Sequence, residues 1–550
     1  MSTIPELFDI ANSHNPELVF MVSHDKIKWK IQDMYKISTA IAKYLINLDV
    51  NTVTIFTRNI PESICIMLGS MMMNSRVCFL CHNSSIIASE YIINQLQSQI
   101  IFVDTIERLN MALKIKKTSK YLKNIVMIGD NDWNDIKKKN INSATNFMKS
   151  SSNDCCEIIY TSGTSGYPKG VMISHDNLLF SANAHIQNNK ILISKPMRFI
   201  SHLPLSHIGA LMNDVIVPLV CIATYRNKSC VYFIKGHSLT IRDLQISRPT
   251  MLFCVPRLWE KIAEEAKKIE RKSNGCIHHL MKKFCLLSHN NRQEGGSIYL
   301  KMIDILARKY MCKCVLNKLG LDKLMLPLTG GAYTNIKTLK YFGGIGLDIL
   351  GAYGMTELMG VQAVSRPNSF IDEYSGLPVY GTEVRVVKET GELCFRGRQV
   401  ALGYYGVNKS CIDDDGWFHT GDIGEIHKTG HIRITGRLDN LIITSTGYKI
   451  VPEPIEASIC NNSVHIENII LIGHCEKFIS ALLCLKINGD ISQALKEIQF
   501  YNEYLSKSKT EKIQKFILIT LKPEDFTVTK KIIRDKIIKR YKNKIKAMYL

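Results

Sequence analysis

Long uninterrupted apolar runs are missing from this 550-residue sequence, because no stretch reaches the roughly 18 consecutive apolar residues that span a bilayer. The start, MSTIPELFDI, lacks the basic segment followed by an apolar one that marks a secretory leader. The 17 cysteines show no disulfide-framework spacing, and the ending KAMYL matches neither the peroxisomal nor the endoplasmic-reticulum retention signal. We therefore expect a cytoplasmic protein in a reducing compartment, with no membrane span.

Zinc-finger spacings and basic-aromatic RNA-binding signatures are also missing, which matters because the formal net charge is +21. Such a charge suits anionic partners, among them nucleotides, coenzyme A, acidic lipid surfaces and nucleic acid. Without a recognition signature we expect no nucleic-acid binding and interpret most of the charge as a solvated basic surface.

The length exceeds what a single hydrophobic core usually supports, so two or more domains are expected. A helical pattern at 34–48 lies among β-rich runs at 53–57 and 99–104, and further strand-like runs occur at 198–205 and 250–256. This alternation is typical of βαβ units and predicts an α/β fold. The basic stretch 267–283 interrupts it and predicts a pair of surface helices.

The pattern changes at Gly391, from where short strands are separated by turn signals. After Arg437 come a strand, a turn that contains glycine and a helix that starts near Pro454. We predict a large N-terminal domain over residues 1–437, made of α/β layers plus a β-rich subdomain. A small α+β C-terminal domain is predicted over 438–550.

The most informative segment is EIIYTSGTSGYPKGVMISH at 157–175, in which a loop of small residues separates two β-runs. Glycines let such a loop turn and approach a phosphate closely, while hydroxyls, backbone N–H groups and a lysine supply donors and positive charge. It is not a Walker loop, since two residues separate the second glycine from the lysine and β-structure should follow. The predicted phosphate-binding residues are Thr161, Ser162, Gly163, Thr164, Ser165, Gly166 and Lys169.

This string resembles the phosphate loop of the adenylate-forming, AMP-binding superfamily of acyl-CoA synthetases, luciferases and peptide-synthetase adenylation domains. The family's other motifs follow in order: LTGGAYT at 328–334, LGAYGMTE at 350–357, DGWFHTGDIG at 415–424 and ITGRLDNLIITSTGYKI at 434–450. The resemblance implies an adenine pocket at Gly330, Gly331, Ala332, Tyr353 and Gly354.

The side chains in these motifs make sense as one ATP site. Tyr353 offers a flat face to a purine, and Thr356 a hydroxyl to the α-phosphate. Glu357 supplies a hard oxygen ligand for Mg²⁺, with Thr161 as the second contact implied by the resemblance. Asp422 can accept both ribose hydroxyls, and Arg437 can donate to the same sugar.

Within the superfamily the chain resembles the bubblegum group of long-chain acyl-CoA synthetases, through SHLPLSHIGAL at 201–211, VPRLWEKI at 255–262 and HCEKFISALLCLK at 474–486. This resemblance implies a ligase that joins a fatty acid to coenzyme A through an acyl-adenylate, at the expense of ATP. His207 falls near the family's acyl and pantetheine channels. The alternative is a histidine that caps a loop.

The resemblance also implies a mobile C-terminal domain, with a hinge at Asp439 and pantetheine passing beside Gly447. Its adenylating lysine corresponds to Lys531, with Lys530 as a rival, but the loop before it is shorter than usual. The short loop motivates an alternative: a catalytically degenerate paralogue that binds nucleotide or acyl chains and regulates. A synthetase for aromatic or short acids is a third reading.

An apolar stripe near the carboxyl end recurs at helical spacing among lysines, at Ile532, Ile533, Ile537, Ile538, Tyr541 and Ile545. Such a stripe either packs on a core or lies on an anionic membrane surface. We favour core packing and keep peripheral membrane contact as the alternative. The oligomeric state is not indicated by any pattern.

Overall fold

The computed structural model of the chain describes most of its residues, namely 2–139, 149–161, 168–236, 238–272, 275–293, 300–367, 369–407, 412–506, 508–526 and 532–550. Several predicted site residues lie outside these ranges: Ser162, Gly163, Thr164, Ser165 and Gly166 of the phosphate loop, and Lys530 and Lys531 near the carboxyl end.

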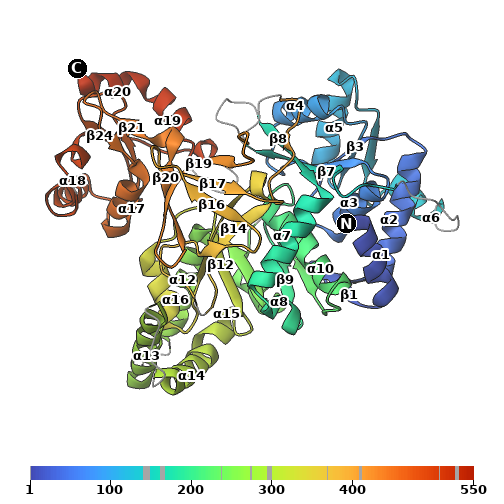
Figure 1. The fold of residues 1–550 in the computed structure, drawn as a ribbon, viewed down its shortest axis with the longest axis horizontal. Helices are drawn as coiled ribbons and strands as arrows, with labels where there is room; N and C mark the ends of the chain where they lie inside the picture. The colour runs from blue at the N-terminus through green and yellow to red at the C-terminus, as the bar shows by residue number, and fades with distance from the viewer. Residues whose placement is uncertain are drawn as a thin grey trace.

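The N-terminal part is built on a seven-stranded sheet with helices on its faces (Figure 1). Its core strands β4, β3, β5 and β6 are parallel, as the βαβ pattern predicts, whereas β7 and β8 form an antiparallel hairpin. In spatial order the strands are β18 (Gly403–Tyr404), β8 (Lys169–Ser174), β7 (Cys155–Thr161), β4 (Arg76–Phe79), β3 (Thr52–Phe56), β5 (Ile100–Val103) and β6 (Asn124–Met127).

Two further sheets complete the large domain. One consists of β11 (Met251–Cys254), β12 (Leu326–Gly330), β13 (Leu350–Met355), β14 (Gly360–Val364) and β15 (Leu377–Pro378). The other consists of β2 (Lys28–Lys30), β1 (Val19–Val22), β10 (Cys230–Phe233) and β9 (Arg198–Ser201). In the first sheet β11, β12 and β13 run parallel, so their carboxyl ends meet at one edge.

The helices of this region pack against the sheets and against one another. Among them are α2 (Ile31–Ile46), α3 (Pro61–Met72), α4 (Ile86–Leu96), α5 (Ile106–Thr118), α6 (Asn131–Lys139), α8 (Ile191–Ser194), α11 (Ile241–Ser247), α15 (Asn317–Leu319) and α16 (Ile336–Gly344). Helix α3 is buried along nearly its whole length and packs on α2. The apolar residues of α3 therefore belong to the hydrophobic core.

Among the described residues one helical stretch, Ile208–Tyr225, is long and apolar enough to cross a membrane by length and composition. It comprises α9 (Ile208–Ala210), η1 (Leu211–Ile216) and α10 (Val217–Ala223), and 78% of it is buried. Helix α10 packs against α1 (Ile4–His14) and α7 (His175–Asn188). Core packing accounts for its apolar composition.

The basic stretch after residue 266 forms the end of α12 (Pro256–Arg271) and the beginning of α13 (Cys276–Gln293), as the predicted helix pair. Helix α13 packs against α14 (Leu300–Met311), which continues as η2 (Cys312–Leu316), and against α16. Fully buried His289 of α13 lies between two carboxylates: Nδ1 is 2.7 Å from Asp348 Oδ1 and Nε2 is 3.2 Å from Asp372 Oδ2.

This histidine predicts a pH-dependent contribution to stability. Burial alone would lower the pKa of His289, but the hydrogen bonds to Asp348 and Asp372 outweigh it and raise the pKa to about 9. Since the ordinary value is 6.5, the contribution is fully present below about pH 6.5 and is lost as the pH rises through about 9. A shift of this size corresponds to about 3 kcal/mol.

We expect the parent to have the larger free energy of unfolding at low pH. The difference from His289→Gln should become smaller as the pH rises from about 6.5 through about 9. Urea unfolding at pH 6.0, 7.5 and 9.5 measures it. Parallel pH curves for the two proteins would contradict a charged His289.

A β-rich subdomain lies between the large sheets and the C-terminal part (Figure 1). It is an antiparallel sheet of β16 (Glu383–Val386), β17 (Glu392–Arg396), β19 (Phe418–Ile426) and β20 (Ile432–Arg437). The change of pattern at Gly391 corresponds to this sheet, although its first strand begins earlier, at Glu383. Strand β20 ends at Arg437, and η4 (Leu438–Asn440) leads to the C-terminal part.

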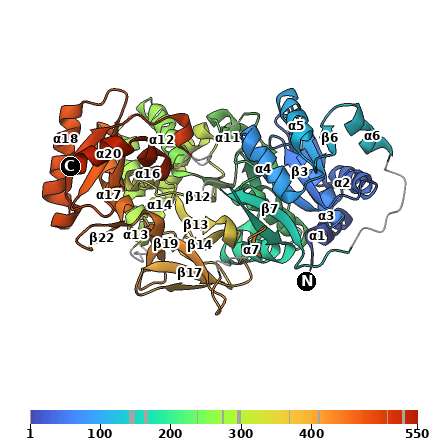
Figure 2. The same cartoon turned by 90° about the horizontal axis from the view of Figure 1, so that it is seen from above.

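The C-terminal part is an α+β unit at the opposite end of the molecule from the first helices (Figure 2). It contains the hairpin β21 (Ile442–Ile443) and β22 (Lys449–Ile450), the sheet β23 (Ile466–Ile472), β24 (Ile479–Leu485) and β25 (Ile513–Leu518), and the helices α17 (Pro452–Asn462), α18 (Ile491–Phe500), α19 (Arg534–Arg540) and α20 (Lys542–Tyr549). Helix α17 begins at Pro452, two residues before the expected start.

The last predicted helix is two helices, because the backbone at Tyr541 leaves helical geometry (φ −98°, ψ 13°) and separates α19 from α20. The apolar stripe on this segment packs on a core cluster of the C-terminal sheet: Ile537 is fully buried, and Ile532, Ile538 and Ile545 contact the same cluster. This packing supports the core interpretation of the stripe.

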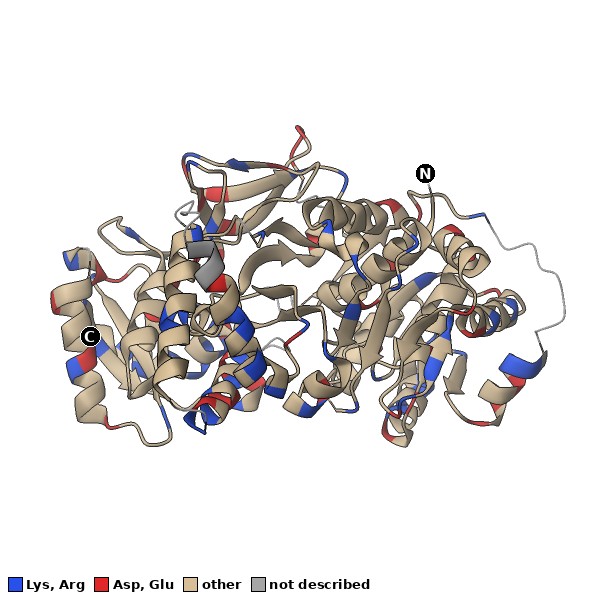
Figure 3. Ribbon diagram, turned by 90° about the horizontal axis from the view of Figure 1, so that it is seen from below, with Lys and Arg blue, Asp and Glu red and all other residues tan. Residues whose placement is uncertain are grey.

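Positive charge is spread widely over the surface. In Figure 3, Lys and Arg occur at both ends of the molecule with Asp and Glu among them, and they do not gather on one face of that view. This distribution agrees with a solvated basic surface.

Candidate functional site

The ribose motif and the adenine motif meet in one hydrogen-bonded cluster. Tyr353 on β13 donates through Oη to Asp422 Oδ2 at 2.6 Å, and Arg437 Nε lies 3.0 Å from Asp422 Oδ1. Asp422 and Arg437 face each other across β19 and β20. Burial, and then the neighbouring Asp422 carboxylate, raise the pKa of Tyr353 well above its ordinary value, so its phenol stays a donor.

The glycine turn lies beside this cluster. Gly330 ends β12 and pairs with Ala352 on β13, immediately before Tyr353. Gly331 follows in a left-handed conformation (φ +81°), with Ala332 exposed. Glycine is needed at position 354 because a Cβ there would lie 1.4 Å from Gly360 O on the paired strand β14. Only glycine fits where these strands approach.

The magnesium motif meets the end of the phosphate loop through a tyrosine. Thr356 and Glu357 form the short helix η3 (Thr356–Leu358), and Glu357, which is 9% exposed, accepts a hydrogen bond from Tyr404 Oη at 2.8 Å. The Nζ atom of Lys169 lies 5.5 Å from the centre of the Tyr404 ring. Thr161 and Lys169 are paired at the ends of β7 and β8.

Two further site residues, Tyr404 and Thr420, were not predicted from the sequence. Tyr404 reaches the site because β18 pairs with β8, a long-range contact without a local signal. Thr420 Oγ1 accepts from Asp422 N at 3.0 Å and donates to Leu393 O at 2.7 Å, which fixes the backbone before the ribose aspartate. The hydroxyl two residues before Asp422 could have indicated this role, since Thr and Ser often hydrogen-bond nearby backbone.

Among the described residues, Gly447 shows no contact with either of these clusters. It occupies the β21–β22 turn with φ +84°, where its N donates to Thr444 O at 2.9 Å and a Cβ would meet no atom within 4 Å. Space therefore does not require glycine here, but the left-handed backbone favours it. His207 is the N-cap of α9 and accepts from Gly209 N at 3.1 Å through Nδ1, as the capping alternative predicts.

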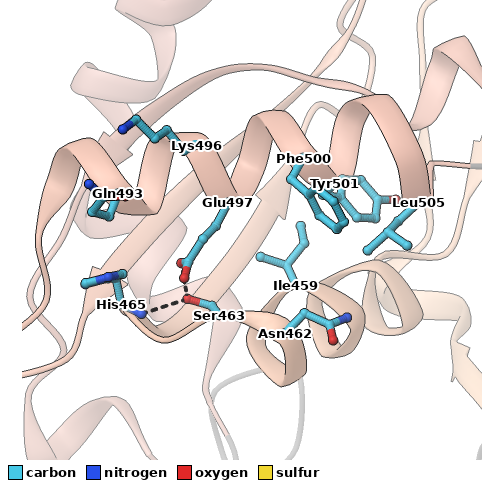
Figure 4. A pocket seen from close by; sticks show the side chains of 10 residues that line it. All are labelled: Ile459, Asn462, Ser463, His465, Gln493, Lys496, Glu497, Phe500, Tyr501 and Leu505. Carbon is cyan, nitrogen blue, oxygen red and sulfur yellow. Dashed lines mark hydrogen bonds between the residues drawn. The ribbon is translucent and has the colours of Figure 1, made fainter.

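A separate cavity of about 370 Å³ lies in the C-terminal part between α17, the loop before β23, α18 and η5 (Tyr501–Leu505) (Figure 4). Its lining includes Ile459, His465, Glu497 and Phe500, and Glu497 accepts from Val464 N at 2.7 Å. None of the predicted ATP-site residues lines it. We therefore place the site at the motif residues and not at this cavity.

Comparison with known protein families gives two matches, which together cover most of the chain. Residues 8–405 match the family described as AMP-binding enzyme, and residues 439–550 match the AMP-binding enzyme C-terminal domain. The chain belongs to the AMP-binding enzyme family. The predicted resemblance to adenylate-forming enzymes and the predicted fold class are thereby confirmed, while the boundary after Arg437 stays a prediction.

This AMP-binding enzyme is similar to long-chain-fatty-acid–CoA ligases, in keeping with the bubblegum resemblance. It is 37% identical over 348 residues to ACSBG2 of Gallus gallus, a match that covers 61% of this chain and 45% of that protein. It is 31% identical over 527 residues to ACSBG1 of Homo sapiens, covering 89% of this chain and 71% of that protein. The match to the first relative thus spans less than half of its length.

Among solved structures, this AMP-binding enzyme is similar to the anthranilate CoA ligase AuaEII in complex with anthranoyl-AMP. The TM-score is 0.77 at 17% identity, over 98% of this chain and 97% of that one. At this identity the likeness concerns the fold.

One interaction of the adenine pocket can be tested by a modest change. Tyr353→Phe keeps the ring but removes the donor to Asp422, and a hydrogen bond to a charged group contributes about 1.5 kcal/mol or more. We expect the KM for ATP to rise by about tenfold, with a smaller change in kcat, in an ATP/pyrophosphate exchange assay at saturating fatty acid. Tyr405→Phe, in the turn that follows β18, is the matched control, and equal effects of the two changes would contradict the role of Tyr353.

Proposed function

We propose that this AMP-binding enzyme joins a long-chain fatty acid to coenzyme A through an acyl-adenylate, with ATP and Mg²⁺. Two contact clusters carry the proposal. One joins Tyr353, Asp422 and Arg437, and the other joins Glu357, Tyr404 and Lys169. Strand β13 leads directly into η3 and so connects the ribose and purine chemistry of the first to the phosphate chemistry of the second. The similarity to long-chain-fatty-acid–CoA ligases supports the choice of acid and thiol.

The residues present fit the chemistry of Mg²⁺. A hard cation of this size is usually held by one or two carboxylates together with substrate phosphates. Glu357 offers a carboxylate and Thr161 a hydroxyl, and Tyr404 holds the Glu357 carboxylate in place. When bound, Mg²⁺ would supply positive charge to the phosphate oxygens of ATP.

The reaction needs no protein nucleophile. In the first step a carboxylate oxygen of the fatty acid forms a bond to the α-phosphorus of ATP, and pyrophosphate leaves. Asp422 and Arg437 would hold the ribose, Tyr353 would face the purine, and Lys169 and Lys531 would offset charge that develops on the phosphates. In the second step the coenzyme A sulfur forms a bond to the acyl carbon, and AMP leaves as the thiol proton is lost.

The experiment is an ATP/pyrophosphate exchange assay with a panel of fatty acids of increasing chain length, followed by addition of coenzyme A. We expect exchange that depends on a long-chain acid, then acyl-CoA and AMP in equal amounts. Exchange stimulated only by aromatic or short acids would support that alternative instead. No exchange with any acid, together with retained ATP binding, would overturn the proposal in favour of a degenerate, regulatory paralogue.

A further inference from the structure

Three potential metal ligands meet on the β-rich subdomain, outside the residues that the ATP site uses. Glu392 and Cys394 are two apart on β17 and so share one face of the strand. His419 on β19 pairs directly with Cys394. One ligand atom from each of these three residues lies within 4.8 Å of the other two. Glu392 and Cys394 are buried, whereas the His419 side chain is 39% exposed and gives access from solvent.

The distances fit a tetrahedral metal ion. Zn²⁺ binds sulfur at about 2.3 Å and imidazole nitrogen at about 2.0–2.1 Å, which places these ligands about 3.5 Å apart at a tetrahedral angle. Cys394 Sγ lies 3.5 Å from His419 Nδ1. His419 Nδ1 lies 2.9 Å from Glu392 Oε2, so the carboxylate would shift by about 0.4 Å to make room for the ion.

The surrounding residues supply the outer contacts of a metal site. Histidines that bind metals nearly always donate their other ring nitrogen to a carboxylate, carbonyl or water. His419 Nε2 lies 3.3 Å from Asp413 Oδ2, and Asp413 is held in turn by Arg385 at 2.7 Å. Glu392 is oriented by Gly421 N, which donates to Oε1 at 2.8 Å and leaves Oε2 directed at His419.

We propose that Glu392, Cys394 and His419 bind one Zn²⁺ ion, with a fourth position open to solvent. On binding, the Cys394 thiol loses its proton and Sγ forms a bond to the metal, while the neutral His419 imidazole binds through the Nδ1 lone pair and keeps its Nε2 proton toward Asp413. The Glu392 carboxylate and the Cys394 thiolate then balance the two charges of the ion, while Arg385 and Asp413 neutralise each other. Thiolate and imidazole together favour zinc over the hard cation Mg²⁺.

This site is independent of the proposed ligase activity, since no Zn²⁺ ligand is among the predicted ATP or Mg²⁺ ligands. It lies on the strand that leads to the ribose residue, three positions before Asp422 on β19. An ion here would fasten β17 to β19 at the paired residues Cys394 and His419. We therefore expect it to raise the melting temperature of the whole chain.

The test is a zinc titration of the full chain, stripped with a chelator, in competition with a chromophoric zinc indicator. We expect one ion per chain with Kd below about 1 μM. Cys394→Ser and Cys394→Val should weaken binding by at least about 100-fold, and Asp413→Asn by about 10- to 100-fold. Cys475→Ser removes an exposed cysteine elsewhere and should bind like the parent.

Co²⁺ binding gives a spectroscopic signal that tests for a metal–sulfur bond, which a purely structural role of Cys394 would not produce. A thiolate-to-cobalt charge-transfer band should appear in the near-ultraviolet spectrum of the parent and of Cys475→Ser, and should be missing in both Cys394 variants. Melting temperatures without metal identify any variant that fails to fold. Parent-like zinc binding by a folded Cys394 variant, or no binding tighter than about 1 μM by the parent, would overturn the proposal.

Discussion

Glu357→Gln is expected to lower the rate of fatty-acid-dependent ATP/pyrophosphate exchange by about 10²- to 10³-fold, the size of effect seen when one preorganised electrostatic contact is lost. The carboxylate is the hard oxygen ligand of the proposed Mg²⁺ site. Glutamine keeps the shape and can still accept from Tyr404 Oη, so the change removes chiefly the negative charge. Because Glu357 is only 9% exposed, a neutral side chain should not destabilise the fold.

Tyr404→Phe separates the charge of Glu357 from its orientation. It keeps the ring and removes the 2.8 Å hydrogen bond to Glu357, and we expect a loss of exchange of about tenfold. Exchange by Glu357→Gln within threefold of the parent would show that the carboxylate is not needed and that the phosphates are held in another way.

Lys531→Ala should abolish most of the first half-reaction, by about 10²-fold or more, and leave the second nearly unchanged. The reason is that a lysine near the α-phosphate offsets charge only while pyrophosphate leaves. The measurement compares exchange with thioester formation from synthetic acyl-adenylate and coenzyme A. Lys530→Ala is the matched control, because Lys530 is the neighbouring rival in the sequence.

The described residues on both sides of this lysine are well anchored. Phe526 and Ile532 form a β-bridge, and Ile533 N donates to Asp525 O at 2.8 Å. Buried Asp525 also accepts from Arg540 Nη1 at 2.7 Å. If Lys530→Ala loses the first half-reaction and Lys531→Ala does not, the assignment moves by one residue. Loss of both half-reactions in Lys531→Ala would contradict a role confined to adenylation.

Much of the fold followed from local pattern. The strands at 53–57 and 99–104 and the helix at 34–48 appear within a few residues as β3, β5 and α2, because buried parallel strands and amphipathic helices leave strong local signals. The break at Tyr541 did not, since the apolar spacing continues across it. Apolar periodicity therefore does not report where the helix ends.

The site was predictable to the extent that its residues belong to ordered motifs. Tyr353, Asp422 and Arg437 were assigned to one sugar and base pocket, and they contact one another. Tyr404 was missed because its place depends on the pairing of β18 with β8, about 230 residues earlier in the chain. The Glu392, Cys394 and His419 cluster was missed for the same reason, since its members meet only when β17 and β19 pair.

The Arg437–Asp422 ion pair has a consequence for the two domains together. Arg437 ends β20, and the next residue, Leu438, begins the turn to the C-terminal part. A ribose whose hydroxyls donate to Asp422 would compete with Arg437 for the same carboxylate, so nucleotide binding would change the restraint on that turn. By thermodynamic linkage the effect is reciprocal. If ATP shifts the equilibrium between orientations of the smaller domain by some factor, then the change of orientation shifts the affinity for ATP by the same factor.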